Sequence, residues 1–226
     1  MATNKEKYLE IKERMGDKAT LVAVSKFKPL EDIQVLYDMG HRDFGENFVQ
    51  ELMMKYEALP KDIRWHFIGH LQSNKVKYIA PFVHLIHGVD TEKLLLEINK
   101  QGAKVNRVID CLLQMHIAEE DTKFGFSEEE LEMLLQKLAA EGTLTHVHIR
   151  GLMGMASFTE DQQKISNEFR HLKKVFDKTQ STLGSAPSPF NINSTGMSAD
   201  YELALAEGST MTRIGSLLFG QRDAAK

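Results

Sequence analysis

Residues 21–29, LVAVSKFKP, decide how the rest of the chain is interpreted. Four apolar or small residues run directly into Ser25 and Lys26, and Pro29 follows three residues after the lysine. This pattern predicts a buried strand whose carboxyl end presents Lys26. A lysine at that position either lies exposed just beyond the strand or has a partner, a depressed pKa or a covalent role. The remainder of the chain distinguishes these alternatives.

The same alternation of a short apolar strand and an amphipathic helix continues along the chain. Strands are expected near residues 21, 43, 64, 85, 108, 146, 190 and 211, with helices between successive pairs. Alternating strands and helices indicate a parallel sheet, and eight such units favour closure into a (β/α)8, or TIM, barrel. An open doubly wound sheet fits less well, because the first turn contains no glycine. We therefore expect an α/β fold with one barrel domain over residues 1–226.

Helix ends are predicted from capping and helix-breaking residues. Glycines after the last periodic residue are expected to end helices at Gly40, Gly102 and Gly142. Hydroxyl residues are expected to open helices at Ser127, Thr159 and Ser198, the first two through capping boxes. Too few residues follow the last strand for a full eighth helix, so a helix over residues 4–15 is expected to cover that gap in the outer ring.

Composition narrows the class of protein. The 226 residues are 42% hydrophobic and 27% charged, with a net charge of −4, which is ordinary for a globular protein. No basic stripe interleaved with aromatic residues points to nucleic acid, and no apolar run approaches the length of a membrane span. Cys111 is the sole cysteine, so no disulfide forms within the chain. We expect a cytoplasmic protein.

In such a barrel the active site lies at the carboxyl ends of the strands. Two turns expected there, residues 194–198 (STGMS) and residues 213–216 (RIGS), carry glycines and hydroxyls after strands seven and eight. Loops at these positions commonly bind phosphate, although each turn alone could be an ordinary cap. A phosphate site opposite Lys26 suggests pyridoxal 5′-phosphate (PLP) held as a Schiff base. Arg213 projects from the last strand near the same end, and if it faces the pyridine nitrogen, its permanent positive charge keeps that nitrogen unprotonated.

Several motifs in this order resemble the pyridoxal phosphate homeostasis protein family, single-domain relatives of the alanine racemase N-terminal barrel (fold type III). The resemblance covers residues from about 20 to 223. It is carried by residues 22–26 (VAVSK), 44–51 (FGENFVQE), 65–75 (WHFIGHLQSNK), 150–153 (RGLM), 196–198 (GMS), 208–211 (GSTM) and 213–215 (RIG). Ser216 stands where many members have threonine, and this exchange keeps the hydroxyl.

The resemblance implies a cofactor site and an intracellular role in vitamin B6 homeostasis. It implies Lys26 as the Schiff-base lysine, Asn47 near the cofactor ring and Arg213 facing the pyridine nitrogen. It also implies Ser198, Gly215 and Ser216 as the phosphate-binding residues. The implied fold has an extra N-terminal helix and no C-terminal β domain.

Other residues admit more than one interpretation. Asn47 and Gln50 have capping-box spacing, so Asn47 could be a helix cap as well as a cofactor contact. His146 and His148 share one face of a strand and could suggest metal, but they lie at the start of that strand, away from the expected site. Lys123 lies in an acidic loop, either as a solvated charge or as a second lysine that reaches the cofactor.

Three functions compete. A racemase-like enzyme needs acid/base groups on both faces of the substrate α-carbon, and in alanine racemase the second is a tyrosine from the partner's β-rich domain. None of the tyrosines here (8, 37, 56, 78 and 201) is expected at a strand's carboxyl end. A metal hydrolase needs ligands on the first strand, where this chain has a lysine. We favour a non-catalytic, monomeric PLP-binding protein that buffers the cofactor or delivers it to apo-enzymes.

Overall fold

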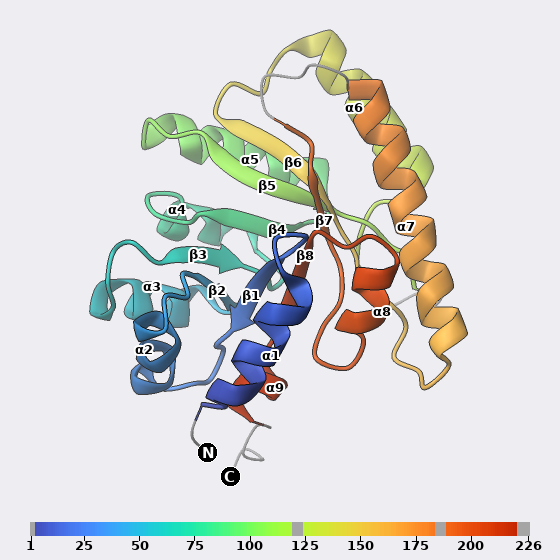
Figure 1. Cartoon of the computed structure of the whole chain (residues 1–226). Helices are drawn as coiled ribbons and strands as arrows, with labels where there is room; N and C mark the ends of the chain where they lie inside the picture. The colour runs from blue at the N-terminus through green and yellow to red at the C-terminus, as the bar shows by residue number, and fades with distance from the viewer. Residues whose placement is uncertain (1–2, 119–123, 184–188, 221–226) are drawn as a thin grey trace.

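The computed structural model describes residues 3–118, 124–183 and 189–220. Eight parallel strands pair in chain order, and β8 also pairs with β1, so the sheet closes into a barrel (Figure 1). The strands are β1 Thr20–Val24, β2 Asp43–Glu46, β3 Arg64–Phe67, β4 Leu85–Val89, β5 Ile109–Gln114, β6 Val147–Met153, β7 Ile192–Ser194 and β8 Met211–Ile214. The predicted (β/α)8 barrel is confirmed.

Helices surround the barrel as an outer ring (Figure 1). They are α1 Lys5–Met15, α2 Leu30–Asp38, α3 Val49–Ala58, α4 Val76–Ile79 after the 3-10 turn Ser73–Lys75, α5 Glu92–Lys104, α6 Glu128–Glu141, α7 Gln162–Leu183, α8 Tyr201–Ala206 and α9 Ser216–Phe219. Within the described ranges, none of these helices has the length and apolar character needed to cross a membrane.

The N-terminal helix α1 covers the part of the outer ring that α9, the short helix after β8, leaves open. The Asn4 side chain caps α1 by accepting a hydrogen bond from Lys7 N–H at 2.9 Å. The Asn4 backbone N–H donates to the carbonyl oxygen of Leu218 in α9 at 2.7 Å. At the other end of α1, Met15 Sδ lies 3.7 Å from the Thr212 hydroxyl of β8. The helix predicted over residues 4–15 therefore closes the ring as expected.

Helix ends that depend on local residues alone were predicted best. Ser127 opens α6 through a complete capping box and Gly142 ends it in the left-handed conformation. The prediction for Gly102 was wrong, because α5 continues to Lys104. A Cβ at Gly102 would lie 2.6 Å from the His146 carbonyl oxygen, so this glycine permits close packing. Thr159 does not open α7; the Asp161 carboxylate accepts from the first N–H groups instead.

Alternation along the strands determines which side chains fill the barrel. One apolar cluster comes from five strands and lies inside it: Val22, Leu85, Leu112, Met153 and Met211. Arg213 follows Met211 by two residues and His87 follows Leu85 by two, so both point inward, and both are buried. The inward face therefore continues from the apolar cluster to the polar groups at the carboxyl end.

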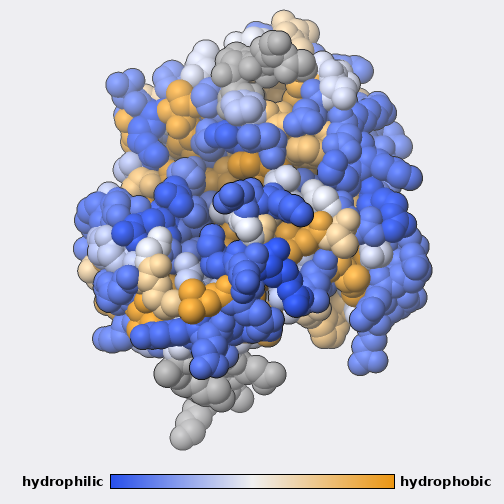
Figure 2. All heavy atoms as spheres, in the orientation of Figure 1, coloured by the Kyte–Doolittle hydropathy of each residue, from blue (hydrophilic) through white to orange (hydrophobic). Residues whose placement is uncertain are grey.

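The larger apolar core lies between the sheet and the helices. Trp65 and Phe44 are fully buried there, and their rings are 6.0 Å apart. Tyr8 of α1 and Phe44 of β2 each make an edge-to-face contact with His41. Hydrophilic residues predominate on the outer surface seen in Figure 2, with hydrophobic residues scattered among them. This division between core and surface is the one that the helix periodicities predict.

Candidate functional site

Lys26 lies in the turn that follows β1, at the carboxyl end of the barrel, and is half-buried. The register pairs Ala23 with Ile214 of β8, so the next residues, Val24 and Gly215, lie side by side. A Cβ at Gly215 would be 3.2 Å from the Val24 carbonyl oxygen. The predicted Schiff-base residue, Lys26, therefore follows β1, and β1 contacts the predicted phosphate turn at Gly215. These two segments are nearly 190 residues apart in sequence.

A buried lysine on a neighbouring helix holds the backbone on both sides of Lys26. Lys55 of α3 donates from Nζ to the Ser25 carbonyl oxygen at 2.7 Å, to Glu46 Oε1 at 2.8 Å and to Glu51 Oε1 at 2.7 Å. The same Glu51 oxygen accepts from Phe27 N–H at 2.6 Å. Lys55 is completely buried. Ser25 binds Lys55 directly, and Phe27 binds it through Glu51. These contacts hold the backbone of the turn on both sides of Lys26.

Glu46 supplies the negative charge beneath this turn. It is the last residue of β2 and its Oε1 accepts a hydrogen bond of 2.5 Å from the Ser25 hydroxyl. Burial raises the pKa of Glu46 to about 7, although Lys55 acts in the opposite direction. Its second oxygen, Oε2, has no hydrogen-bond partner among the described residues. This carboxyl group therefore changes charge near neutral pH.

Phe27, directly after Lys26, has φ +62°, a left-handed conformation that non-glycine residues seldom adopt. Such a conformation costs about 1–3 kcal/mol and persists only where the surroundings impose it. Here the hydrogen bond to Glu51 and a ring contact with Phe48, with centroids 5.0 Å apart, impose it. Strain of this kind is concentrated at functional sites, and this instance is next to the predicted cofactor lysine.

The two predicted phosphate turns come together. The Ser198 hydroxyl accepts a hydrogen bond from Gly215 N–H at 3.1 Å. Ser198 therefore does not cap α8, as the sequence suggested; α8 begins at Tyr201, and Asp200 instead accepts from Met197 N–H at 2.6 Å. Thr195 carries a buried hydroxyl with no partner among the described residues. Ser216 is the exposed first residue of α9, beside Gly215.

Arg213 points from β8 into the barrel and is only 4% exposed. Its Nη1 donates to the Ser194 hydroxyl at 2.6 Å and to the Ser194 carbonyl oxygen at 2.9 Å, and Nη2 donates to the Gly154 carbonyl oxygen at 3.1 Å. Burial lowers the pKa of Arg213 to about 10. The guanidinium therefore remains a cation at neutral pH and is fixed beneath the two phosphate turns.

A line of buried polar groups runs from Arg213 along the barrel interior. The Ser194 hydroxyl lies 3.2 Å from His87 Nδ1, His87 Nε2 lies 3.0 Å from His66 Nδ1, and His66 Nε2 lies 3.1 Å from Asp43 Oδ1. Burial lowers the pKa of His87 well below its usual value, so this ring is neutral. One consistent assignment has every group donate toward Asp43, which joins the buried cation to the carboxylate through neutral groups.

Asn47 follows β2 and faces the same end of the barrel. Its Oδ1 is buried without a hydrogen-bond partner among the described residues. The helix after it begins beyond Phe48 with no side-chain cap, so the capping interpretation of Asn47 was wrong. Gly69, which follows β3 closely, would place a Cβ 2.4 Å from the Asn47 carbonyl oxygen. A cavity of about 360 Å³ contains Asn47, Gly69 and His70.

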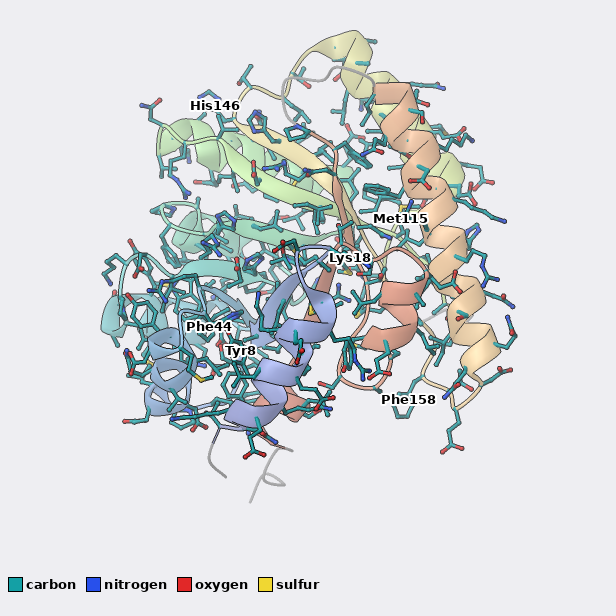
Figure 3. All side chains as sticks on the ribbon, in the orientation of Figure 1. Tyr8, Lys18, Phe44, Met115, His146 and Phe158 are labelled. Carbon is teal, nitrogen blue, oxygen red and sulfur yellow. The ribbon has the colours of Figure 1, made fainter. Side chains whose placement is uncertain are left out.

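Of two other cavities, one contains a predicted site residue and the other contains none. One of about 820 Å³ contains Ser198, Tyr201 and the exposed Phe158, which extends away from the barrel (Figure 3). Another of about 750 Å³ lies at the opposite, amino-terminal end and contains none of the predicted site residues. The predicted contact Lys123 lies outside the described residues.

Orphaned polar atoms indicate that the carboxyl end suits a polar ligand. A buried oxygen without a partner is unfavourable, and the residues that carry Asn47 Oδ1 and Thr195 Oγ1 follow β2 and β7 at this end. Gly215 keeps the space beside Val24 open, and Arg213 supplies a fixed positive charge. These residues fit a ring-and-phosphate cofactor such as PLP. The sequence pattern did not indicate that Lys55, Glu46 and His87 belong to the surrounding network, and it placed Ser194 in a phosphate turn without indicating its bond to Arg213.

Comparison with known sequences identifies the family. The family model described as "Alanine racemase, N-terminal domain" matches residues 2–223. A pyridoxal phosphate homeostasis protein of Aquifex aeolicus is 40% identical over 205 residues, which are 90% of this chain and 87% of that protein. The protein of the same description from Schizosaccharomyces pombe is 36% identical over 214 residues, covering 93% of this chain and 87% of its own.

Solved structures agree with this result. PipY of Synechococcus elongatus with PLP bound superimposes with a TM-score of 0.85 at 32% identity, covering 95% of this chain and 99% of PipY. An alanine racemase of Clostridium difficile has a TM-score of 0.75 at 12% identity, and 58% of that chain is covered. The racemase likeness shows the barrel fold alone. On the strength of the sequence matches, the chain belongs to the pyridoxal phosphate homeostasis protein family.

Proposed function

We propose that this protein binds PLP as a Schiff base with Lys26 and takes part in vitamin B6 homeostasis by buffering or delivering the cofactor in the cytoplasm. One observation carries the proposal: Lys26 follows the strand that packs against Gly215, whose N–H is bonded to Ser198. Closure of the barrel thus brings the Lys26 amine, the turn that contains the Ser198 hydroxyl and the Arg213 cation to one end of the barrel. PLP bound to PipY, a 32% identical protein, supports the cofactor assignment.

Each residue has a defined part in holding the cofactor. Bound PLP supplies an aldehyde for a lysine amine and an electron-withdrawing ring. Lys26 is the attachment point, held by Lys55 through both neighbouring residues. Ser198, Gly215 and Ser216 would hold the phosphate, and Asn47 would contact the ring. Arg213 would face the pyridine nitrogen, where a permanent cation would keep that nitrogen unprotonated.

A weak racemase-like activity is the alternative, and the alanine racemase family match favours testing it. Racemisation needs an acid/base group on each face of the substrate α-carbon. Lys26 can serve one face. The five tyrosines all lie in helices, and Tyr201, the one that lines the cavity beside Ser198, donates its hydroxyl to Glu202 at 3.0 Å. Nothing among the described residues therefore assigns a second base to the opposite face.

A transfer experiment tests the proposed function. The cofactor-loaded protein, freed of unbound PLP, is mixed with an apo-enzyme that depends on PLP, with and without a scavenger of free PLP. We expect the apo-enzyme to become active, and activation that survives the scavenger indicates direct delivery. Retention of all cofactor for hours without activation would contradict both buffering and delivery. Lys26→Ala protein, incubated with PLP and desalted in the same way, is the control and should activate nothing.

Assays with amino acids distinguish the alternative. Incubation of the loaded protein with L-alanine should yield D-alanine far more slowly than the roughly 1 s⁻¹ at the lower end of typical enzymes. Turnover at or above that rate would replace the carrier proposal with the racemase alternative. The proposed monomeric state is tested separately by light scattering of the purified protein, where a dimer mass would contradict it.

A further inference from the structure

A second cluster of ligand-type side chains lies at the amino-terminal end of the barrel. The cavity of about 750 Å³ at that end is lined by Asp43, His66 and His84, together with basic residues such as Lys18 (labelled in Figure 3) and Arg64. These residues belong to the starts of strands, whereas Lys26 and the phosphate turns lie at the strand carboxyl ends. The cluster therefore lies at the opposite end of the barrel from the proposed cofactor site, although His87 and Ser194 connect His66 to Arg213.

We propose that Asp43, His66 and His84 form a binding site for a divalent transition-metal ion, with Zn²⁺ as the best match. One donor atom from each of these three residues lies within 4.8 Å of the other two. Asp43 begins β2, His66 lies in β3, and His84 directly precedes β4. Three adjacent parallel strands thus present one carboxylate and two imidazoles at a single edge, a donor set that zinc and related ions prefer.

The distances suit such an ion after a small movement of one ring. Bonds of about 2.0–2.1 Å require donor atoms separated by roughly 3.3 Å in a tetrahedral site. His66 Nε2 and Asp43 Oδ1 are already 3.1 Å apart. His84 is exposed, and among the described residues its ring makes no hydrogen bond and only an edge contact with His66, with centroids 5.3 Å apart. The His84 ring can therefore turn toward the other two donors.

The surroundings orient the two buried ligands. Metal-bound histidines usually donate their second ring N–H to another group, and His66 Nδ1 lies 3.0 Å from His87 Nε2. With a metal on Nε2, His66 carries its proton on Nδ1 and His87 accepts it, while His87 Nδ1–H donates to Ser194. This change needs only an exchange of tautomers in the two rings. Arg64 donates to both oxygens of Asp43, from Nη2 to Oδ2 at 2.5 Å and from Nε to Oδ1 at 2.7 Å. When the ion binds Oδ1, the Nε hydrogen bond breaks and the Nη2 hydrogen bond still holds the carboxylate.

The fourth coordination position faces the cavity. Three protein ligands with an open position are the arrangement of zinc sites that bind water or a substrate group. The volume of about 750 Å³ is far more than a water molecule needs. The basic residues along this cavity would favour an anionic group at the open position. The proposal concerns this chain's own residues and does not depend on the cofactor function.

Zinc titration of the full-length protein tests the proposal. After dialysis against a chelator, the protein is titrated with Zn²⁺ in competition with a chromophoric chelator, and Co²⁺ is used in parallel for its visible spectrum. We expect one equivalent of Zn²⁺, a Co²⁺ spectrum typical of nitrogen and oxygen ligands, and no competition from millimolar Mg²⁺. Absence of saturable Zn²⁺ binding, or displacement by Mg²⁺, would overturn the site.

Variants assign the ligands. His84→Ala alters an exposed ring, so the variant should fold normally. We expect it to weaken Zn²⁺ binding at least tenfold. Asp43→Asn keeps the side-chain size and should weaken Zn²⁺ binding by a similar factor. His148→Ala is the matched control, because His148 forms a histidine–aspartate pair of 3.3 Å with Asp110 in neighbouring strands. Equal affinity in wild type and His84→Ala, or an equal loss in His148→Ala, would overturn the assignment.

Discussion

The Ser194 hydroxyl receives a hydrogen bond from Arg213 Nη1 at 2.6 Å and lies 3.2 Å from His87 Nδ1. It therefore links the buried cation beneath the proposed cofactor site to the histidines of the barrel interior. Ser194→Ala should lower the free energy of unfolding by about 1–3 kcal/mol, because both neighbours lose a buried partner. It should also weaken PLP retention, because Arg213 loses the side-chain member of its three hydrogen bonds and is positioned less firmly.

Urea denaturation and equilibrium dialysis of PLP measure these two effects. Ser181→Ala is the matched control, since the Ser181 hydroxyl bonds only to the Asp177 carbonyl oxygen on the exposed side of α7. It should change stability by less than about 0.5 kcal/mol. If Ser194→Ala behaves like Ser181→Ala in both measurements, Ser194 does not position Arg213.

Replacing Lys55 should be strongly destabilising. Lys55→Met leaves Glu46 buried without its cation and should reduce the free energy of unfolding by about 3–5 kcal/mol. The double variant Glu46→Gln with Lys55→Met should recover much of that loss, because no uncompensated charge remains in the core. Lys100→Met, at an exposed lysine, serves as the control in the same urea titrations. A double variant as unstable as Lys55→Met would refute the charge explanation.

The raised pKa of Glu46 predicts a pH dependence with a definite sign. Its folded pKa of about 7 exceeds the ordinary value of 4.5, so the folded state binds more protons than the unfolded state between these two values. Stability from this group is therefore lost as pH rises from about 4.5 to about 7, by about 3 kcal/mol in total. Glu46→Gln should remove this contribution, which denaturation at a series of pH values would reveal. An unchanged slope in the variant would exclude Glu46 as its source.

Gly69 controls the position of Asn47. Gly69→Ala would bring a methyl group to 2.4 Å from the Asn47 carbonyl oxygen, so the backbone there must shift. We expect weaker PLP binding and a loss of stability greater than in Gly40→Ala. Gly40 has φ +92° and open space around it, so alanine there costs about 1 kcal/mol through the backbone alone. Equal PLP affinity in the two variants would show that Asn47 does not contribute to the site.

The sequence allowed the fold and the place of Lys26 and Arg213 at the carboxyl end of the barrel to be predicted, because both depend on the β/α alternation. The network around Lys26 was not predictable in this way. Lys55 lies four residues after Glu51, a spacing typical of an exposed helical pair. It is buried only because Glu46 and the Ser25 carbonyl approach from two different strands.

Ser198 illustrates the same limit. Its sequence context is that of a helix cap, and local pattern offers no reason to assign it another partner. The hydroxyl bonds to Gly215 N–H instead, because barrel closure brings the turn after β8 beside the turn after β7. Thr159 and Asp161 differ for a smaller reason: the Thr159 hydroxyl accepts from Asp161 N–H at 3.2 Å, and the N–H groups at the start of α7 bond to Asp161 instead.

The attachment of PLP to Lys26 is the central claim, and borohydride trapping tests it most directly. PLP-loaded protein is reduced, digested and analysed by mass spectrometry, with Lys26→Ala and Lys28→Ala treated identically. Lys28 lies two residues away and donates to the Phe219 carbonyl oxygen at 2.7 Å, so it is a close control. We predict the reduced cofactor on Lys26 in wild type and in Lys28→Ala, and none in Lys26→Ala. A stoichiometric label that persists in Lys26→Ala would contradict the account.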